Sequence, residues 1–324
     1  MSSNDIFCKA PFSQLLLNPE GRFFPCCYHF GAKLGDMKND ELSAVWNGKK
    51  IQKLRKEFLE GKPKTCRGRM QQIQCHQNFE RLQLPEKPAV IMSKQPMRLD
   101  LRLNGLCNLR CVMCDVWQQP NHRWDDSNFW EDGPITLFPQ LQEIDLLGGE
   151  PFVQKDTYRL IETVSAINKD CLWSFVTNGH YRFTKTLTKA LDKIKIRKIQ
   201  LSLDSLIPAN YQLIRKGNLN LTLNTLNKWL DYRNSRTEPF DFVCSLAVID
   251  KNFSEIANFL DFCLEKKIAP ELQYVVYDPS GNSSLKYDSA CEKEAKVAII
   301  DRWLPNYFDE SRKQLELIKR ALAH

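Results

Sequence analysis

The chain of 324 residues is 43% hydrophobic, which is enough for a sizeable core, and its length corresponds to about two domains. No apolar run reaches the roughly 18 residues of a membrane span, and the N-terminus "MSSNDIFCKAPF" lacks the basic and apolar regions of a secretory signal. We therefore expect a cytoplasmic protein in which clustered cysteines bind metal instead of forming disulfides.

The net charge of +7 is carried by the first part of the chain. Residues 1–95 hold 16 Lys/Arg and 9 Asp/Glu, whereas the remainder holds 30 of each. A basic face of this kind could attract an acidic peptide or nucleic acid. A solvated surface that offsets anionic thiolates accounts for the same excess, and we favour this second interpretation, with no nucleic-acid partner.

Residues 1–84 form a small cysteine-rich domain. The segment "LLLNPEGRFF" predicts a β-hairpin with its turn at 18–21. Residues 40–46 and 49–61 predict helices, and Gly61 provides a stop signal for the second. The three prolines within 85–97 predict a linker.

Strands and helices alternate in residues 98–284, which favours a parallel sheet with helices outside it. We predict an α/β fold, a partial (β/α)6 TIM-like barrel preceded by the hairpin-plus-helix domain and followed by a helical extension at 285–324, broken near Pro305. The expected strands are 98–104, 142–148, 172–179, 197–205, 242–249 and 272–278, and the expected helices include 155–168, 184–193, 221–234 and 254–267.

The first barrel strand alternates between apolar and polar residues. Leu99, Leu101 and Leu103 share one face, because side chains on a strand point alternately to its two sides. Asp100 and Arg102 share the other face. The leucines are expected to pack on helices, which leaves a polar face toward the barrel interior.

The segment "CNLRCVMC" holds Cys107, Cys111 and Cys114 on one loop after the first barrel strand. Thiolates suit zinc, copper(I) or iron–sulfur clusters, and a four-iron cluster held by three cysteines keeps one iron open to another ligand. The loop falls at the C-terminal end of the strand, where barrels of this type place their active sites. A zinc site completed by a distant residue such as His122 is the alternative.

This segment resembles the CxxxCxxC signature of the radical S-adenosylmethionine (radical SAM) enzymes. The resemblance implies a SAM-binding [4Fe–4S] cluster, reductive cleavage of SAM to a 5′-deoxyadenosyl radical, and hydrogen abstraction from a substrate. The cluster cysteines then count as the catalytic residues. It extends over roughly 97–280 and implies SAM contacts at strand ends, namely Gly148, Gly149 and Glu150 of "GGEP", Asn178 of "TNG", Ser202 and Asp204 of "SLD", and Arg215 of "IRKG".

The N-terminal domain resembles the SPASM/twitch auxiliary iron–sulfur domains, through Cys8, a spacer, Gly21-x4-Cys26 and the stretch that leads to Cys66. The resemblance implies one auxiliary cluster of the [4Fe–4S] type, with Cys8, Cys26, Cys66 and Cys75 as its ligands. Cys27 is the alternative to Cys26, and a structural zinc on the same thiolates is the alternative to the cluster. In most relatives this domain follows the barrel, whereas here it precedes it.

The resemblance implies an oxidoreductase or peptide-modifying enzyme that acts on a peptide or protein side chain by oxidation, cross-linking or epimerisation. The alternative keeps the radical chemistry and takes a sugar, nucleoside or other small molecule. A reductant such as flavodoxin or ferredoxin is the expected partner. A zinc-bearing nucleic-acid-binding module is the hypothesis from another class, and it leaves "GGEP", "SLD" and Arg215 without a role.

Overall fold

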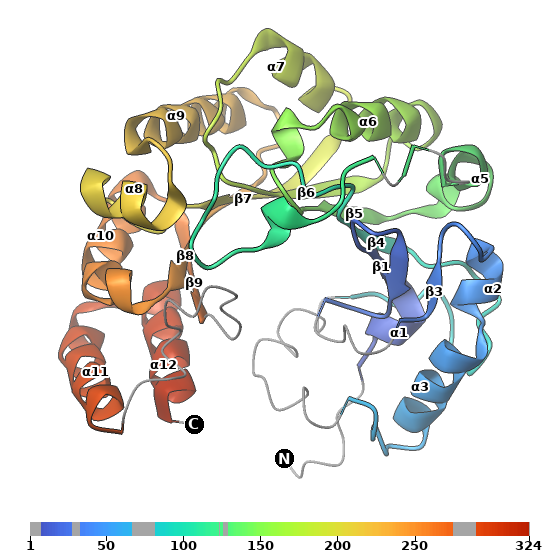
Figure 1. Ribbon diagram of the computed structural model, residues 1–324, viewed down its shortest axis with the longest axis horizontal. Helices are drawn as coiled ribbons and strands as arrows, with labels where there is room; N and C mark the ends of the chain where they lie inside the picture. The colour runs from blue at the N-terminus through green and yellow to red at the C-terminus, as the bar shows by residue number, and fades with distance from the viewer. Residues whose placement is uncertain are drawn as a thin grey trace. The chain divides into compact units, whose positions relative to one another are not determined.

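A computed structural model describes residues 8–27, 33–66, 82–122, 124–125, 129–274 and 290–323 (Figure 1). The chain divides into two compact units. The first comprises residues 1–106, 119–174 and 189–195, and the second comprises 107–118, 175–188 and 196–324. Among the helices of these described ranges, none has both the length and the apolar character needed to cross a bilayer.

The sheet of the first unit joins the N-terminal domain to the first barrel strands. Its order is β3 (Gly35–Asp36), β2 (Arg22–Phe24), β1 (Gln14–Leu17), β4 (Arg98–Leu101) and β5 (Glu143–Leu146). The hairpin pair β1/β2 is antiparallel, as the turn sequence predicts, whereas β1/β4 and β4/β5 are parallel. Figure 1 shows β1 beside β4, although more than 80 residues separate them in the sequence. The N-terminal domain therefore extends the barrel sheet directly.

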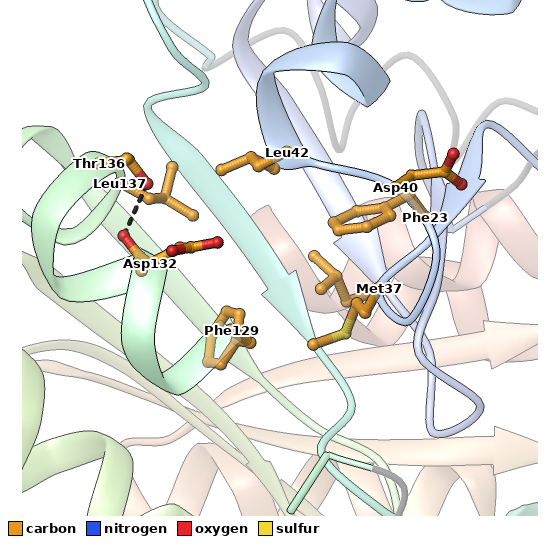
Figure 2. A pocket seen from close by; sticks show the side chains of 10 residues that line it. Phe23, Met37, Asp40, Leu42, Phe129, Asp132, Thr136 and Leu137 are labelled. Atoms are coloured by element: carbon orange, nitrogen blue, oxygen red, sulfur yellow. Dashed lines mark hydrogen bonds between the residues drawn. The ribbon is translucent and has the colours of Figure 1, made fainter. Parts of the chain in front are cut away.

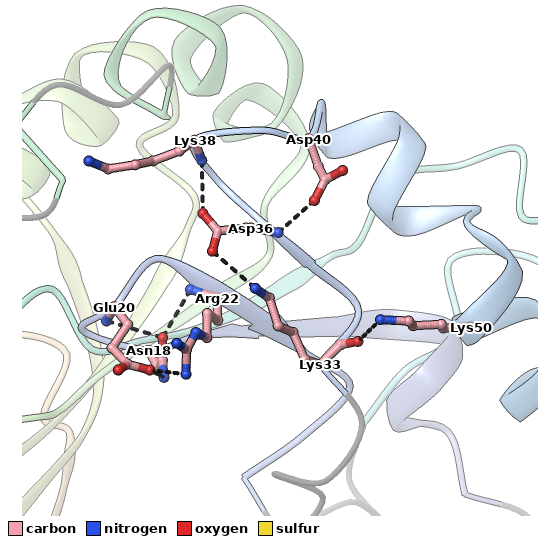
Figure 3. A network of polar contacts seen from close by, with 8 residues as sticks. All are labelled: Asn18, Glu20, Arg22, Lys33, Asp36, Lys38, Asp40 and Lys50. Carbon is pink, nitrogen blue, oxygen red and sulfur yellow. Dashed lines mark hydrogen bonds and ion pairs between the residues drawn. The ribbon is translucent and has the colours of Figure 1, made fainter.

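The hairpin turn is held by the side chain of Asn18. Its Oδ1 accepts hydrogen bonds from the backbone N–H groups of Glu20 (3.1 Å) and Arg22 (2.9 Å), as an Asx turn requires (Figure 3). Gly21 has φ +75° and donates to the Asn18 carbonyl at 2.9 Å. The turn fixes the direction in which β2 leads to Cys26 and Cys27.

A second polar group in Figure 3 anchors β3. Asp36 accepts from Lys33 Nζ (3.1 Å) and from the backbone N–H of Lys38 (3.2 Å), and its own N–H donates to Asp40 (2.8 Å). Burial alone would raise the pKa of Asp36, but the hydrogen bonds from Lys38 and Lys33 outweigh it and lower the pKa.

The helices of the first unit are α1 (Ala10–Ser13), α2 (Leu42–Trp46), α3 (Lys49–Leu59), α5 (Phe129–Thr136), α6 (Lys155–Ile167), η2 (Phe138–Gln140) and η3 (Pro151–Val153). Of these, α2, α3 and α6 match the expected helices, whereas α1, α5, η2 and η3 lie in segments for which no helix was predicted. The segment expected as a linker is fastened to α2, because Trp46 Nε1 donates to the Lys94 carbonyl (2.8 Å) and Asn47 Nδ2 to the Met92 carbonyl (2.9 Å).

The second unit continues the alternation. β6 (Leu172–Thr177) and α7 (Lys185–Leu191) are divided between the units, and β7 (Lys195–Ser202), β8 (Asp241–Val248) and β9 (Ala269–Tyr274) run parallel. The remaining elements are η1 (Val116–Gln118), α8 (Pro208–Arg215), α9 (Leu219–Ser235), η4 (Asp250–Glu255), α10 (Ile256–Lys266), α11 (Ala290–Trp303), η6 (Leu304–Asn306) and α12 (Asp309–Ala323). The predicted α/β class and the six barrel strands, β4 to β9, are confirmed. Residues 275–278 of the last expected strand lie outside the described residues.

Strand β4 is buried on both faces. Leu99, Leu101 and Leu103 are at most 1% exposed, as expected for residues that pack on helices. On the polar face Asp100 is only 5% exposed. Burying a carboxylate is unfavourable unless it is paired or hydrogen-bonded, so Asp100 needs a cation or a hydrogen-bond donor near it.

The C-terminal extension consists of two helices separated at η6, as predicted, and α12 packs against β9. Leu315, Ile318 and Leu322 are buried, whereas Leu317 is only partly covered. The scattered cysteines Cys171, Cys244 and Cys263 are buried small residues, and the side chain of Cys291 lies outside the described part of the chain.

Candidate functional site

The three-cysteine loop belongs to the second unit, and all three thiols are partly buried. Asn178 Nδ2, which follows β6, lies 3.6 Å from Cys107 Sγ. The Cys111 thiol contacts the Arg215 carbonyl at 3.8 Å, and the Val112 N–H donates to the Ile214 carbonyl at 2.9 Å. The loop is therefore attached to the C-terminal end of α8, which carries Arg215.

Asp204 and Arg215 form a buried ion pair beside this loop, with side chains 1% and 7% exposed. Asp204 Oδ1 also accepts from the Ala247 N–H at 2.8 Å. Burial would lower the pKa of Arg215, but the charges of Cys111 and Asp204 outweigh it and raise the pKa well above its usual value. Arg215 is thus a permanent cation next to Cys111. Ser202, the last residue of β7, is partly exposed and pairs in register with Ser245.

Two residues that the sequence analysis did not single out hold this loop in place. Asn108 Nδ2 donates to the His180 carbonyl (2.5 Å), and Asn178 Nδ2 donates to Asn108 Oδ1 (2.9 Å). His180 Nε2 accepts from the Asn218 N–H at 2.9 Å, which ties the turn after Arg215 to the same segment. Burial, reinforced by the charge of Arg215, lowers the pKa of His180, so the neutral ring is favoured. The available signal was its position directly after "TNG".

The "GGEP" segment belongs to the first unit. Gly148 and Gly149 have φ +92° and +58°, and a Cβ on Gly149 would lie 2.2 Å from the Leu106 carbonyl oxygen. Gln154 Nε2 fastens the same turn by donating to the carbonyls of Gly148 (2.9 Å) and Leu106 (3.1 Å). Glycine is required here because the backbone is left-handed and closely approached.

Glu150 is fully buried, and its carboxylate accepts from the Phe152 N–H at 3.2 Å. Burial raises the pKa of the neighbouring Tyr158, and the negative charge of Glu150 adds to this effect. The segment therefore places a buried carboxylate directly after the two glycines with left-handed backbone.

The three thiols of the cysteine loop suit an iron–sulfur cluster. A four-iron cluster held by three cysteines takes one thiolate on each of three irons and keeps the fourth iron open. Burial raises the pKa of the Cys111 thiol to about 11, and Arg215 opposes this shift. Donor chemistry and the adjacent cation fit an anionic iron–sulfur cluster. His122, the alternative zinc ligand, has a side chain that is 81% exposed and lies 3.2 Å from Asp125.

The N-terminal cysteines form a second group, within the first unit. Cys26 packs with Ala10 and Leu82, and Cys8 and Cys27 border the same cluster. Burial raises the pKa of Cys27 to about 12, with Asp100 as the next cause. Cys66 is partly buried after α3, and Cys75 lies outside the described residues.

A small apolar pocket in the first unit is distinct from both cysteine groups. Figure 2 shows its lining, which includes Phe23 and Met37 of the N-terminal domain and Phe129 and Leu137 near α5. It holds about 40 Å³, which is room for little more than one water molecule. It is therefore a packing gap and not a substrate site.

Comparison with known proteins agrees with both cysteine groups. Residues 8–75 match the SPASM family, an iron–sulfur cluster-binding domain, and residues 102–263 match the radical SAM superfamily. These matches confirm the predicted cofactors: a SAM-binding [4Fe–4S] cluster, SAM itself and an auxiliary iron–sulfur cluster.

Curated relatives include the GTP 3',8-cyclases of Listeria welshimeri (26% identity, 56% of this chain and 54% of the relative) and Haemophilus ducreyi (31%, 39% and 38%). The chain thus spans about half the length of the Listeria relative and less than half the length of the Haemophilus relative. Among solved structures, Streptococcus suis SuiB bound to S-adenosylmethionine is similar, with 17% identity over 75% of this chain and 53% of that chain and a TM-score of 0.49. The structure of anSMEcpe with bound AdoMet is also similar, with 17% identity over 65% of this chain and 61% of that chain and a TM-score of 0.49. Since the superfamily match covers half of the sequence, this chain belongs to the radical SAM superfamily.

Proposed function

We propose that this protein cleaves SAM reductively at a cluster held by Cys107, Cys111 and Cys114. The observation that carries the proposal is the attachment of this loop to α8, whose last residue, Arg215, is buried against Asp204. When bound by these cysteines, the cluster would supply the one electron needed to cleave the carbon–sulfur bond of SAM, for hydrogen abstraction from the substrate by the 5′-deoxyadenosyl group.

The chain's own residues would orient SAM. The Arg215 guanidinium is suited to the methionyl carboxylate, because it meets a carboxylate with two parallel hydrogen bonds. Asp204 keeps that guanidinium in place, and Asn178 holds the first cysteine of the loop. Gly148, Gly149 and Glu150 are assigned to the amino group of SAM, and Ser202 to its polar groups. Asp204 and Arg215 are almost fully buried, and a charged contact made at such a position is stronger than one in water.

The test is anaerobic reconstitution with iron and sulfide, followed by measurement of 5′-deoxyadenosine formed with dithionite. A matched variant with all three loop cysteines replaced by alanine should retain the auxiliary iron and form no 5′-deoxyadenosine. The proposal is contradicted if the reconstituted wild-type protein stays colourless, or if its electron paramagnetic resonance spectrum does not change when SAM is added.

For the substrate we propose a small polar molecule such as a nucleoside or sugar. Asp100 supports this class, because its buried Oδ1 accepts no hydrogen bond from the residues that the structure describes and lies 3.6 Å from Arg102 Nε. An unsatisfied buried acceptor costs about 1–3 kcal/mol, which a donor on the substrate would recover. The curated relatives named GTP 3',8-cyclase also act on a small molecule.

A peptide or protein side chain is the second candidate, with the auxiliary site as electron acceptor, since residues 8–75 match the SPASM family. The two classes separate when nucleosides, nucleotides, sugars and candidate peptides are compared for substrate-dependent 5′-deoxyadenosine formation. With the correct small molecule, Asp100→Asn should raise KM about tenfold and leave substrate-free SAM cleavage unchanged. Stimulation by peptides alone would reject the small-molecule assignment.

The domain boundaries at 84/85, 97/98 and 284/285 remain part of this proposal, as does the assignment of Cys8, Cys26, Cys66 and Cys75 to the auxiliary cluster.

A further inference from the structure

The positive charge of this protein is concentrated in one short segment. Residues 49–64, which form α3 and the loop after it, contain seven Lys/Arg and two Glu, a net +5 out of the +7 of the whole chain. Of the seven, Arg55 is buried, where it donates to the Pro11 carbonyl at 2.8 Å. The other six are lysines, so nearly all of this charge faces solvent or lies near the surface.

Four of these lysines line an open groove of about 650 Å³. The lining residues are Lys53, Lys56, Glu57, Glu60, Lys62, Lys64 and Thr65. All four lysines are exposed, and the Lys56–Glu60 pair at 3.8 Å has both side chains more than half exposed. The four lysines and two glutamates of the lining give a net charge of +2, so the groove has a positive potential.

The groove reaches to within one residue of Cys66, one of the proposed auxiliary ligands. Glu57 accepts from the Thr65 N–H (2.7 Å) and from its hydroxyl (2.6 Å), and its carbonyl accepts from the Lys62 N–H (2.8 Å). These bonds fold the loop back onto α3 and fix Thr65. The next residue is Cys66, one of the four proposed cluster ligands, so the lining of the basic groove ends one residue before a proposed ligand of the auxiliary cluster.

We propose that this groove docks an acidic one-electron carrier protein, a flavodoxin or ferredoxin, that delivers electrons at the auxiliary site. The inference rests on the proposed function. Complementary charge speeds encounter and orients the partner. Nucleic acid fits less well, because single strands favour aromatic stacking platforms, whereas the lining of this groove contains two glutamates and no aromatic residue.

The redox step balances with one electron. In each encounter the reduced carrier loses one electron and the protein's iron–sulfur centres gain one, which matches the single electron needed to cleave one SAM molecule. No proton or bond changes at the groove itself.

The experiment compares two electron sources in fully reconstituted protein. The test variant combines Lys53→Glu, Lys56→Glu and Lys64→Glu, and the matched control combines Lys169→Glu, Lys185→Glu and Lys189→Glu, three exposed lysines outside the segment. With flavodoxin and its reductase, the test variant should need at least about tenfold more flavodoxin for half-maximal 5′-deoxyadenosine formation. With dithionite, both variants should match the wild type.

Direct binding measurements test independently of turnover whether the basic groove is the docking surface. Flavodoxin and ferredoxin are titrated calorimetrically against the wild type and both variants at low and high salt. We expect binding to the wild type and control that weakens with salt, and a loss of at least tenfold in the test variant. Equal binding to all three proteins, binding of neither carrier, or tight binding of RNA at the groove overturns the inference. A wild type that binds the carrier but never cleaves SAM with dithionite refutes the proposed function instead.

Discussion

The two cysteine groups of this protein are built in opposite ways. Cys107, Cys111 and Cys114 come from one eight-residue stretch, and hydrogen bonds to two other segments, residues 178–180 and the end of α8, hold that stretch. Cys8, before α1, and the adjacent Cys26 and Cys27, after β2, meet around the apolar residues Ala10 and Leu82. The first group therefore depends on polar contacts to a loop, and the second depends on the packing of a small domain. The variants below test this difference.

The largest effect should come from removing each cysteine group in turn. Replacing the three loop cysteines with alanine should abolish 5′-deoxyadenosine formation, because no other described segment offers three thiols in one stretch. Replacing Cys8, Cys26 and Cys66 should remove the auxiliary iron and lower thermal stability, yet leave SAM-dependent spectral changes at the loop cluster. Iron analysis and electron paramagnetic resonance measure both, and loss of the SAM response in the second variant contradicts the separation.

The second largest effect should follow from Asp204→Asn. Breaking a buried ion pair costs about 3–5 kcal/mol, and Arg215 would no longer be held beside Cys111, so SAM affinity should fall at least about a hundredfold. Isothermal titration of reconstituted protein with SAM measures this loss. Arg182→Gln, a change at an exposed arginine, is the control. Equal SAM affinity in both variants would contradict the assignment of Asp204 to the SAM site.

A glycine comparison sharpens the role of "GGEP". Gly149→Ala places a Cβ 2.2 Å from the Leu106 carbonyl at φ +58°, so the turn must shift and SAM affinity should fall about tenfold or more. Gly61→Ala is the matched change, because Gly61 also has positive φ, +65°, and lies in the loop after α3. It should cost only about 1–2 kcal/mol of stability, read by thermal unfolding, with SAM affinity unchanged. Similar SAM affinity in the two variants contradicts the assignment.

The smallest effect concerns His180 and pH. Its neutral Nε2 accepts from Asn218, and a protonated ring could not. Its folded-state pKa is lowered below the ordinary value of about 6.5, so the contribution to stability is complete above about 6.5 and declines as the pH falls from there to the folded-state pKa.

The matched variants at this position are His180→Gln and His180→Leu. We expect SAM affinity of the wild type to fall at acidic pH as His180 becomes protonated. Glutamine can supply an acceptor in place of Nε2 without titrating, so the SAM affinity of His180→Gln should not fall at acidic pH. Leucine should weaken SAM binding severalfold at every pH between 5 and 8. If His180→Gln shows the same dependence of SAM affinity on pH as the wild type, the proposed role of the His180 ring is rejected.

The sequence was most informative where its signals are local. The periodicity of the strands predicted β4 to β8 to within a few residues, and the turn at 18–21 predicted the hairpin, because both depend on neighbours in the chain. The spacing of "CNLRCVMC" indicated three metal ligands for the same reason. By contrast, His180 was overlooked, since its partners Asn108 and Asn218 are 72 and 38 residues away.

By itself the sequence determined the α/β class, the cysteine loop and the residues at the strand ends, since these follow from side-chain alternation and ligand spacing within short stretches. Only the tertiary structure decided that β1 pairs in parallel with β4, so that the N-terminal domain extends the barrel sheet although it precedes it in the chain. It also decided that Arg215 is buried against Asp204 beside Cys111. Strand partners and buried ion pairs join residues far apart in the chain, and their free energy is gained only when the whole fold excludes water from them.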